Sequence, residues 1–212
     1  MPRQSNQASA AEKILNIAEQ LAQTRGFNGF SYADIAEKLT VTKASLHYHF
    51  PSKGELGRAL IVRYEAAFDR ELDAISRQTD DAMKRLRRYS QLYEAVMRKD
   101  RMCLCGMLAA EYATLPAPMQ EELRRFFRTN ERWLTTVLEE GRRKGNLSFR
   151  GSARDRAGVL LGALEGTLLV ARSCSDDRLF RNTANRLLAD LRAGGSLRNQ
   201  RKADRPTIAA AA

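Results

Sequence analysis

The sequence predicts an all-α fold, made of a short N-terminal group of three helices and a larger helical body. Through most of the 212 residues, apolar side chains recur at the i, i+3, i+4 spacing of an amphipathic helix. The apolar–polar alternation that marks a half-buried strand is almost absent. Residues that start helices, and Gly or Pro residues that end some of them, divide the chain into helical segments.

Three short helices are expected within the first fifty residues. Ser9 opens the first helix with the spacing of a capping box, and Gly26 ends it. A second helix begins at Ser31, and a third covers about residues 42–50 after a tight turn. Pro51 ends the third helix, because proline lacks an N–H group and disfavours helical geometry in the residue before it.

Longer helices are expected to follow, joined by short loops. They cover about residues 52–76, 80–99, 103–113, 117–144, 153–173 and 176–192. Beyond residue 193 the composition of Gly, Arg, Asn, Gln and Ala predicts a flexible tail. The expected division of the chain is therefore 1–52, 53–193 and 194–212.

Composition excludes several classes of protein. A hydrophobic fraction of 43% is that of a globular chain rather than a disordered one. No apolar run reaches the ~18 residues that would cross a bilayer, and no secretory signal is visible, so no membrane partner is expected. Three Cys fit a reducing cytoplasm better than a disulfide framework. The net charge of +11 favours a polyanionic partner without locating it.

Residues 31–50 have the length pattern of a helix-turn-helix, whose second helix lies in the major groove of DNA. On a helical wheel, Leu46 and Phe50 of the second helix share the face that packs on the first helix. The outward positions are Lys43, Ala44, Ser45, His47 and Tyr48. These side chains can approach base edges and phosphates without burying large apolar groups. The helix pattern alone fits an ordinary amphipathic helix of a bundle equally well.

Residues 14–61 resemble the DNA-binding domain of the TetR/AcrR family of transcriptional regulators. The matching segments are I-L-x-x-A at 14–18, a glycine turn at 26–31, D-I-A at 34–36, V-T-x-x-x-L-x-Y-H-F at 41–50 and a hinge at 50–56. Ala44 stands where many members carry Gly. Beyond about residue 60 the resemblance is one of architecture. It implies a cytoplasmic, ligand-responsive repressor that binds a palindromic operator in double-stranded DNA as a homodimer.

The resemblance also implies the residues that contact DNA. Phosphate contacts are implied for Ser31, Tyr32, Thr42, Tyr48 and Lys53. Base-facing positions are implied for Lys43, Ala44, Ser45 and His47. Lys43 suits the guanine O6 and N7 atoms, and Ala44 suits a thymine methyl group. His49 is expected to contact the DNA backbone or to pack inside the domain.

In such a regulator, residues 53–193 bind a small-molecule effector and form the dimer. Gly158, Gly162 and Gly166 form one stripe, and each costs ~0.5–1 kcal/mol relative to Ala in a helix interior. Something is therefore expected to approach this backbone closely, either a partner helix or another part of the same chain. Candidate effector-pocket residues are Tyr64, Phe68, Tyr89, Tyr93, Met107, Tyr112 and Trp133. An ordinary core position is the alternative for each of them.

Cys103 and Cys105 are candidates for sensing oxidants or electrophiles, because nearby basic residues can lower a thiol pKa. The alternative is that they are small buried hydrophobic residues. The two histidines of the chain, His47 and His49, diverge by about 200° on a helix, so no metal or cofactor is expected. Glu111 is an acid that could bind a cationic ligand, although an Arg partner is favoured.

Enzyme motifs such as G-x-S-x-G or a phosphate-binding glycine loop are absent, so the chain is not expected to be an enzyme. The alternative function is a helical binding protein whose helix-turn-helix no longer reads DNA. Residues 1–60 hold seven Lys and Arg against five Asp and Glu, so most of the positive charge lies beyond the motif. It gathers at 84–88, 98–101 and 192–205. This charge either attracts DNA without sequence preference or forms a solvated surface.

Overall fold

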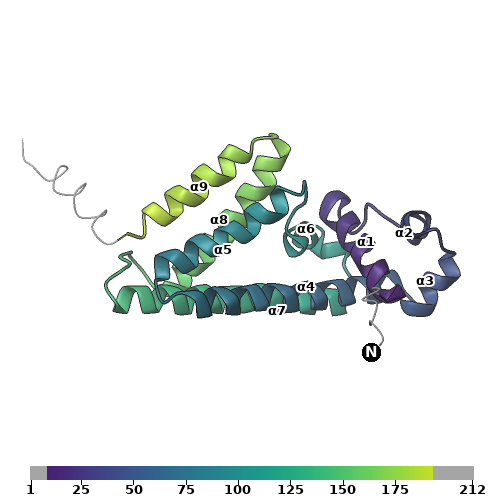
Figure 1. Cartoon of the computed structure of the whole chain (residues 1–212), viewed down its shortest axis with the longest axis horizontal. Coiled ribbons are helices and arrows are strands. Elements are labelled where there is room, and N and C mark those ends of the chain that lie inside the picture. The colour runs from purple at the N-terminus through teal and green to yellow at the C-terminus, as the bar shows by residue number, and fades with distance from the viewer. Residues whose placement is uncertain (1–8, 193–212) are drawn as a thin grey trace, which may run out of the picture. The chain divides into compact units, whose positions relative to one another are not determined.

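The computed structural model describes residues 9–192, which form nine α-helices and one 3₁₀ turn (Figure 1). In chain order these are α1 (Ala10–Arg25), α2 (Tyr32–Leu39), α3 (Lys43–His49), α4 (Lys53–Gln78), α5 (Ala82–Met97), α6 (Leu104–Ala110), η1 (Tyr112–Thr114), α7 (Ala117–Arg143), α8 (Ala153–Ser173) and α9 (Asp177–Ala189). The all-α expectation is confirmed. The tail expected at 194–212 lies outside the described residues.

The helix expected over 103–113 is the clearest correction to the sequence analysis. The structure ends α6 at Ala110 and adds the separate turn η1, with Glu111 between them. Leu115 follows in an extended conformation, at ψ 142°. Pro116 accounts for that conformation, because proline disfavours helical geometry in the residue before it. The break leaves the Glu111 side chain at the junction of two short elements.

The chain divides into two compact units. Among the described residues, the first contains 9–71 together with 95–129, and the second contains 72–94 together with 130–192. Helices α4, α5 and α7 contribute residues to both units. The expected division by function, at residue 52, is a separate matter and stays a prediction.

The first unit is built around the three N-terminal helices and α6. Helix α1 packs against both α2 and α6, and α2 packs against α3. Ile35 and Leu56 are completely buried. Gly57 lies where α4 meets Met119 and Phe27, and a Cβ added there would come within 2.5 Å of the Met119 side chain. A larger residue at this position would force the end of the Met119 side chain and the Phe27 ring to move.

The second unit pairs α8 with α9, which a short turn connects (Figure 1). Its core is strongly aromatic. Tyr89 stacks on Trp133 with ring centroids 5.6 Å apart, and Tyr93 stacks on Phe180 at 6.3 Å. The buried hydroxyl of Tyr89 donates to the side-chain oxygen of Asn130 at 3.1 Å, which satisfies both polar groups. None of the helices within 9–192 has both the length and the apolar character needed to cross a membrane.

Candidate nucleic-acid interface

The first helix of the motif, α2, begins with a complete capping box at Ser31. The Ser31 hydroxyl oxygen accepts from the Ala33 N–H at 3.2 Å, and the Asp34 carboxylate accepts from the Ser31 N–H at 2.8 Å. The hydroxyl also donates to Asp34, and these hydrogen bonds hold the pKa of the Asp34 carboxyl below its usual value. The side chain expected to meet phosphate therefore also fixes the start of α2.

The turn and the cap of α3 orient the second helix. Thr40 adopts a left-handed conformation, with φ 55°, that ends α2. The Thr42 hydroxyl then accepts from the Ser45 N–H at 3.3 Å and caps α3. Leu46, only 1% exposed, anchors the inner face of α3. The Thr42 cap fixes the start of α3, and the buried Leu46 fixes which face of the helix points inward. The side chains on the opposite face therefore point outward.

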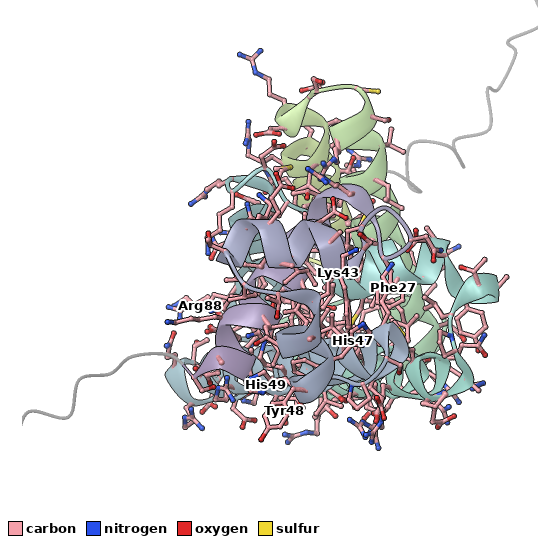
Figure 2. All side chains as sticks on the ribbon, turned by 90° about the vertical axis from the view of Figure 1, so that its right-hand side faces the viewer. Phe27, Lys43, His47, Tyr48, His49 and Arg88 are labelled. Atoms are coloured by element: carbon pink, nitrogen blue, oxygen red, sulfur yellow. The ribbon has the colours of Figure 1, made fainter. Side chains whose placement is uncertain are left out.

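The outward face of α3 carries the side chains expected to meet bases. Lys43, Ala44, Ser45, His47 and Tyr48 are all exposed. Tyr48 is 85% exposed, and its ring lies edge-on to that of His49, with centroids 5.2 Å apart (Figure 2). His49 itself is half-buried. The sequence-based assignment of inner and outer faces on α3 is thus realised in the structure.

His47 and Tyr32 connect the two helices of the motif. The His47 ring lies 4.6 Å from the Tyr32 ring, and its Nδ1 atom lies 3.1 Å from the Pro51 carbonyl oxygen. The Tyr32 hydroxyl donates to the Phe50 carbonyl at 2.7 Å. Burial, assisted by the negative charge of Glu55, raises the pKa of Tyr32 to about 12. Tyr32 therefore acts inside the motif and ties the start of α2 to the end of α3.

Lys53 is also held by the protein. Its ammonium group donates to the carbonyl oxygens of Phe27 and Phe30 and lies 4.6 and 4.5 Å from the centres of their rings. Burial lowers its pKa, and the nearby charges of Glu111 and Asp34 oppose that shift. Two of its three N–H donors are thus engaged, which leaves one for an outside ligand.

Four of the expected DNA contacts surround one small hollow. It has a volume of about 230 Å³ and is lined by Phe30, Ser31, Tyr32, His47 and Lys53. A hydroxyl, an imidazole and an ammonium group therefore converge beside the N-terminus of α2. Hydroxyl and cationic donors at a helix N-terminus suit a phosphate oxygen.

Sequence reasoning missed the role of Glu111. Instead of pairing with an arginine, its carboxylate accepts from the backbone N–H groups of Phe27, at 2.6 Å, and Asn28, at 3.2 Å. Asn28 adds a side-chain hydrogen bond to Thr114 at 2.8 Å. The loop before α2 is thus held by the α6–η1 segment. Glu111 lies 84 positions after Phe27 and 83 positions after Asn28, so no local pattern in the sequence could reveal these contacts.

The seven candidate effector-pocket residues fall into two groups. Tyr64, Phe68, Met107 and Tyr112 lie in the first unit, and Tyr89, Tyr93 and Trp133 lie in the second. Phe68 packs on Phe126 at 5.3 Å, beside Tyr64. The tyrosines of the second group are almost fully buried. Their assignment to an effector pocket stays a prediction.

Both candidate sensing cysteines are buried as free thiols. Cys103 is 1% exposed and Cys105 is not exposed at all. The Tyr64 hydroxyl lies 3.7 Å from the Cys103 sulfur and can donate to it. Within residues 9–192, no three His, Cys, Asp or Glu side chains gather closely enough to hold a metal ion. An oxidant would therefore have to reach these thiols through an opening of the first unit.

The glycine stripe of α8 faces open space. A Cβ added at Gly158, Gly162 or Gly166 would meet no atom within 4 Å. Close packing against another part of the described chain is therefore not the reason for these glycines. Val159 and Val170, on the same helix, are 51% and 50% exposed. This helix thus presents bare backbone and apolar side chains together.

Comparison with known proteins matches both parts of the chain. The family described as "Bacterial regulatory proteins, tetR family" matches residues 14–60. The family described as "Tetracyclin repressor-like, C-terminal domain" matches residues 82–187. The N-terminal match covers α2, α3 and the start of α4, where the exposed polar face and the small hollow were found.

Several known proteins also match this chain over most of its length. The HTH-type transcriptional repressor NemR of Escherichia coli is 28% identical over 165 residues, 76% of this chain and 83% of NemR. The nucleoid occlusion factor SlmA of Vibrio campbellii is 27% identical over 186 residues, 85% of this chain and 92% of SlmA. A TetR-family regulator from Agrobacterium tumefaciens superimposes with a TM-score of 0.84 at 33% identity, covering 86% of this chain and 97% of that one.

These relatives are regulators rather than enzymes, which confirms the expected class of function. The matches extend through both units and include the helix-turn-helix whose geometry is described above. The chain belongs to the TetR family of bacterial transcriptional regulators and is a DNA-binding regulator with a helix-turn-helix.

Proposed function

We propose that this regulator is a ligand-responsive repressor that binds a palindromic operator as a homodimer in the cytoplasm. The outward face of α3 carries the proposal, because it exposes five short or polar side chains around one buried leucine. In a dimer, two such helices enter successive major grooves about 34–36 Å apart. Repression is supported by NemR, which is named as a repressor.

The proposed contacts divide into three groups. Base edges are read by Lys43, Ala44, Ser45 and His47. Phosphates are held by Ser31, Thr42, Tyr48 and Lys53, and the first and last of these line the small hollow. Tyr32 and His49 position the motif, since the Tyr32 hydroxyl is bonded to Phe50 and His49 is half-buried. Tyr48 is the strongest phosphate candidate because it is so fully exposed.

Dimerisation is proposed through α8 and α9. The open stripe of Gly158, Gly162 and Gly166 supports this, because a partner helix can approach a glycine backbone more closely than any other. The exposed valines beside the stripe, Val159 and Val170, supply apolar area that a partner would bury. A two-fold dimer also matches the two-fold symmetry of a palindromic operator.

The proposed effector is a small molecule that binds in the helical body and moves α4. The candidate contacts are either the aromatic residues around Phe68 in the first unit or those around Tyr89 in the second. Because α4 begins at Lys53, whose ammonium group holds the loop before α2, a shift of α4 changes how the helix-turn-helix is supported. Effector binding would then lower operator affinity by favouring a second arrangement of these elements.

The test is operator binding by variants of the outward face. An operator is selected from a pool of random duplexes, and affinity is measured by gel shift. Lys43→Ala and Tyr48→Phe are expected to weaken specific binding. Lys38→Ala is the matched control, because Lys38 is exposed on α2 and lies outside the proposed contacts. Equal binding by all three variants and the wild type would overturn the assignment of α3.

A further inference from the structure

The four basic residues at 84–88 have two different roles. Arg85 is only 8% exposed, and its guanidinium donates to Glu140 at 2.7 Å. It also donates to the carbonyl oxygens of Ser76, at 3.1 Å, and Thr79, at 2.7 Å, at the end of α4. Arg85 is therefore a structural residue that joins the end of α4 to α5 and α7.

The other three cations of the run face solvent. Lys84, Arg87 and Arg88 are exposed, and the Arg88 side chain extends outward from α5 (Figure 2). Together with Gln91 they line a hollow of about 360 Å³. Within the described part of the chain, none of the three has an ion-pair partner. This basic face, defined as Lys84, Arg87, Arg88 and Gln91, is therefore uncompensated.

The basic face lies at the start of α5. The helix begins at Ala82, and its first turn holds no acidic residue. The Asp81 carboxylate, just before the helix, accepts from the Lys84 N–H at 2.9 Å. This carboxylate offsets the positive end of the helix, so the attraction of the basic face for an anion comes from its three cationic side chains.

The spacing suits an extended anion. The four residues recur at i, i+3, i+4 and i+7, so they form one stripe about 10 Å long on a helix that rises about 1.5 Å per residue. Neighbours in such a stripe have Cβ atoms about 5–6 Å apart. The long side chains can therefore reach several anionic groups in a row. The stripe holds no apolar side chain that would select an uncharged ligand.

We propose that the basic face is a second, sequence-independent contact with duplex DNA, at which α5 holds the phosphate backbone. Exposed single ion pairs are weak, so an open hollow does not retain a small monoanion. A polyanion that meets three cations at once gains from the release of its condensed counterions. Arginine forks match phosphate oxygens, and the chain is a DNA-binding regulator, so duplex DNA is the polyanion it meets.

This contact goes beyond operator reading by α3, and the experiment separates the two. Affinity of the full chain for a random-sequence duplex is measured by fluorescence anisotropy between 50 and 200 mM salt. The variant is Lys84→Gln with Arg87→Gln and Arg88→Gln. Each neutralised phosphate contributes about 0.9 to the slope of log affinity against log salt. Three lost contacts reduce the slope by about 2.7, so the wild type loses about 40-fold more affinity over this range than the variant.

The matched control removes three other exposed cations that have no ion-pair partner among residues 9–192. It combines Arg70→Gln, Arg77→Gln and Arg143→Gln. This control has the same net charge as the variant and is expected to change the slope by less than one. Equal slopes for the two triple variants overturn the proposal. Polyglutamate binding that depends on the basic face, with an unchanged DNA slope, also overturns it and indicates an acidic protein partner.

A further comparison keeps this test independent of the proposed operator reading. The triple variant of the basic face is expected to keep the wild-type preference for a selected operator over random duplex. Lys43→Ala is expected to lose that preference while keeping the contribution of the basic face to the salt slope. A loss of operator preference in the basic-face variant would overturn the inference, because it would make α5 part of specific recognition.

Discussion

The Glu111 carboxylate and the loop before α2 allow a quantitative prediction. In Glu111→Gln the side chain keeps its shape but loses its charge and one acceptor atom. One of the two N–H groups, those of Phe27 and Asn28, would then face an amide NH₂ instead of an oxygen. Hydrogen bonds to a charged group contribute about 1.5–3 kcal/mol each. We therefore expect local opening of this loop to become easier by about 2–3 kcal/mol.

Amide hydrogen exchange measures that opening directly. Since about 1.4 kcal/mol corresponds to a factor of ten, exchange in a peptide covering residues 24–32 should speed up about 30- to 140-fold. Glu121→Gln is the matched control, because Glu121 is 67% exposed and pairs only with Arg124 on its own helix. Exchange that rises equally in the two variants, or in neither, would refute the idea that Glu111 holds the loop.

Three further predictions follow from the described contacts. Burial raises the pKa of Tyr32 to about 12, so the stability that its neutral hydroxyl gives the fold should be complete below pH 10 and lost as pH rises toward 12. Urea unfolding of Tyr32→Phe should not show this loss. A pH profile of stability identical to that of the wild type would contradict the assigned burial. Gly162→Leu points into open space in one chain, so we expect a folded monomer by sedimentation, whereas a persisting dimer would move the interface elsewhere. Because Cys105 is completely buried, we expect the wild type and Cys105→Ser to give equal responses when release of operator DNA by an electrophile is measured, and a response that only the wild type shows would establish sensing by this thiol.

Local signals in the sequence predicted most of the fold. The first three helices start where the sequence placed them, at Ser9, Ser31 and Thr42, because the cap that starts a helix depends on residues within three positions of it. The inner and outer faces of α3 followed from helical periodicity, with Leu46 buried and Tyr48 exposed. These features are decided within one or two turns of helix, so a single sequence is enough to find them.

Contacts between distant residues could not be predicted in this way. Lys53 was expected to meet phosphate, yet its ammonium group is engaged by carbonyls 26 and 23 residues earlier. Tyr32 was expected to contact phosphate, but its hydroxyl donates to the Phe50 carbonyl, 18 residues later. Such pairings depend on how helices pack, which no local pattern encodes. The open space beside Gly162 is likewise visible only once the neighbouring elements are in place.

Base-by-base readout by Lys43 tests most directly the claim that α3 reads DNA in the major groove. Affinities of the wild type and Lys43→Ala are measured on the selected operator and on every single-base variant of one half-site. A bidentate contact to guanine predicts a loss of about 1–3 kcal/mol and relaxed specificity at one base pair of each half-site. Uniform weakening across all variants, with specificity unchanged at every position, would contradict direct reading by Lys43 and by the face of α3 to which it belongs.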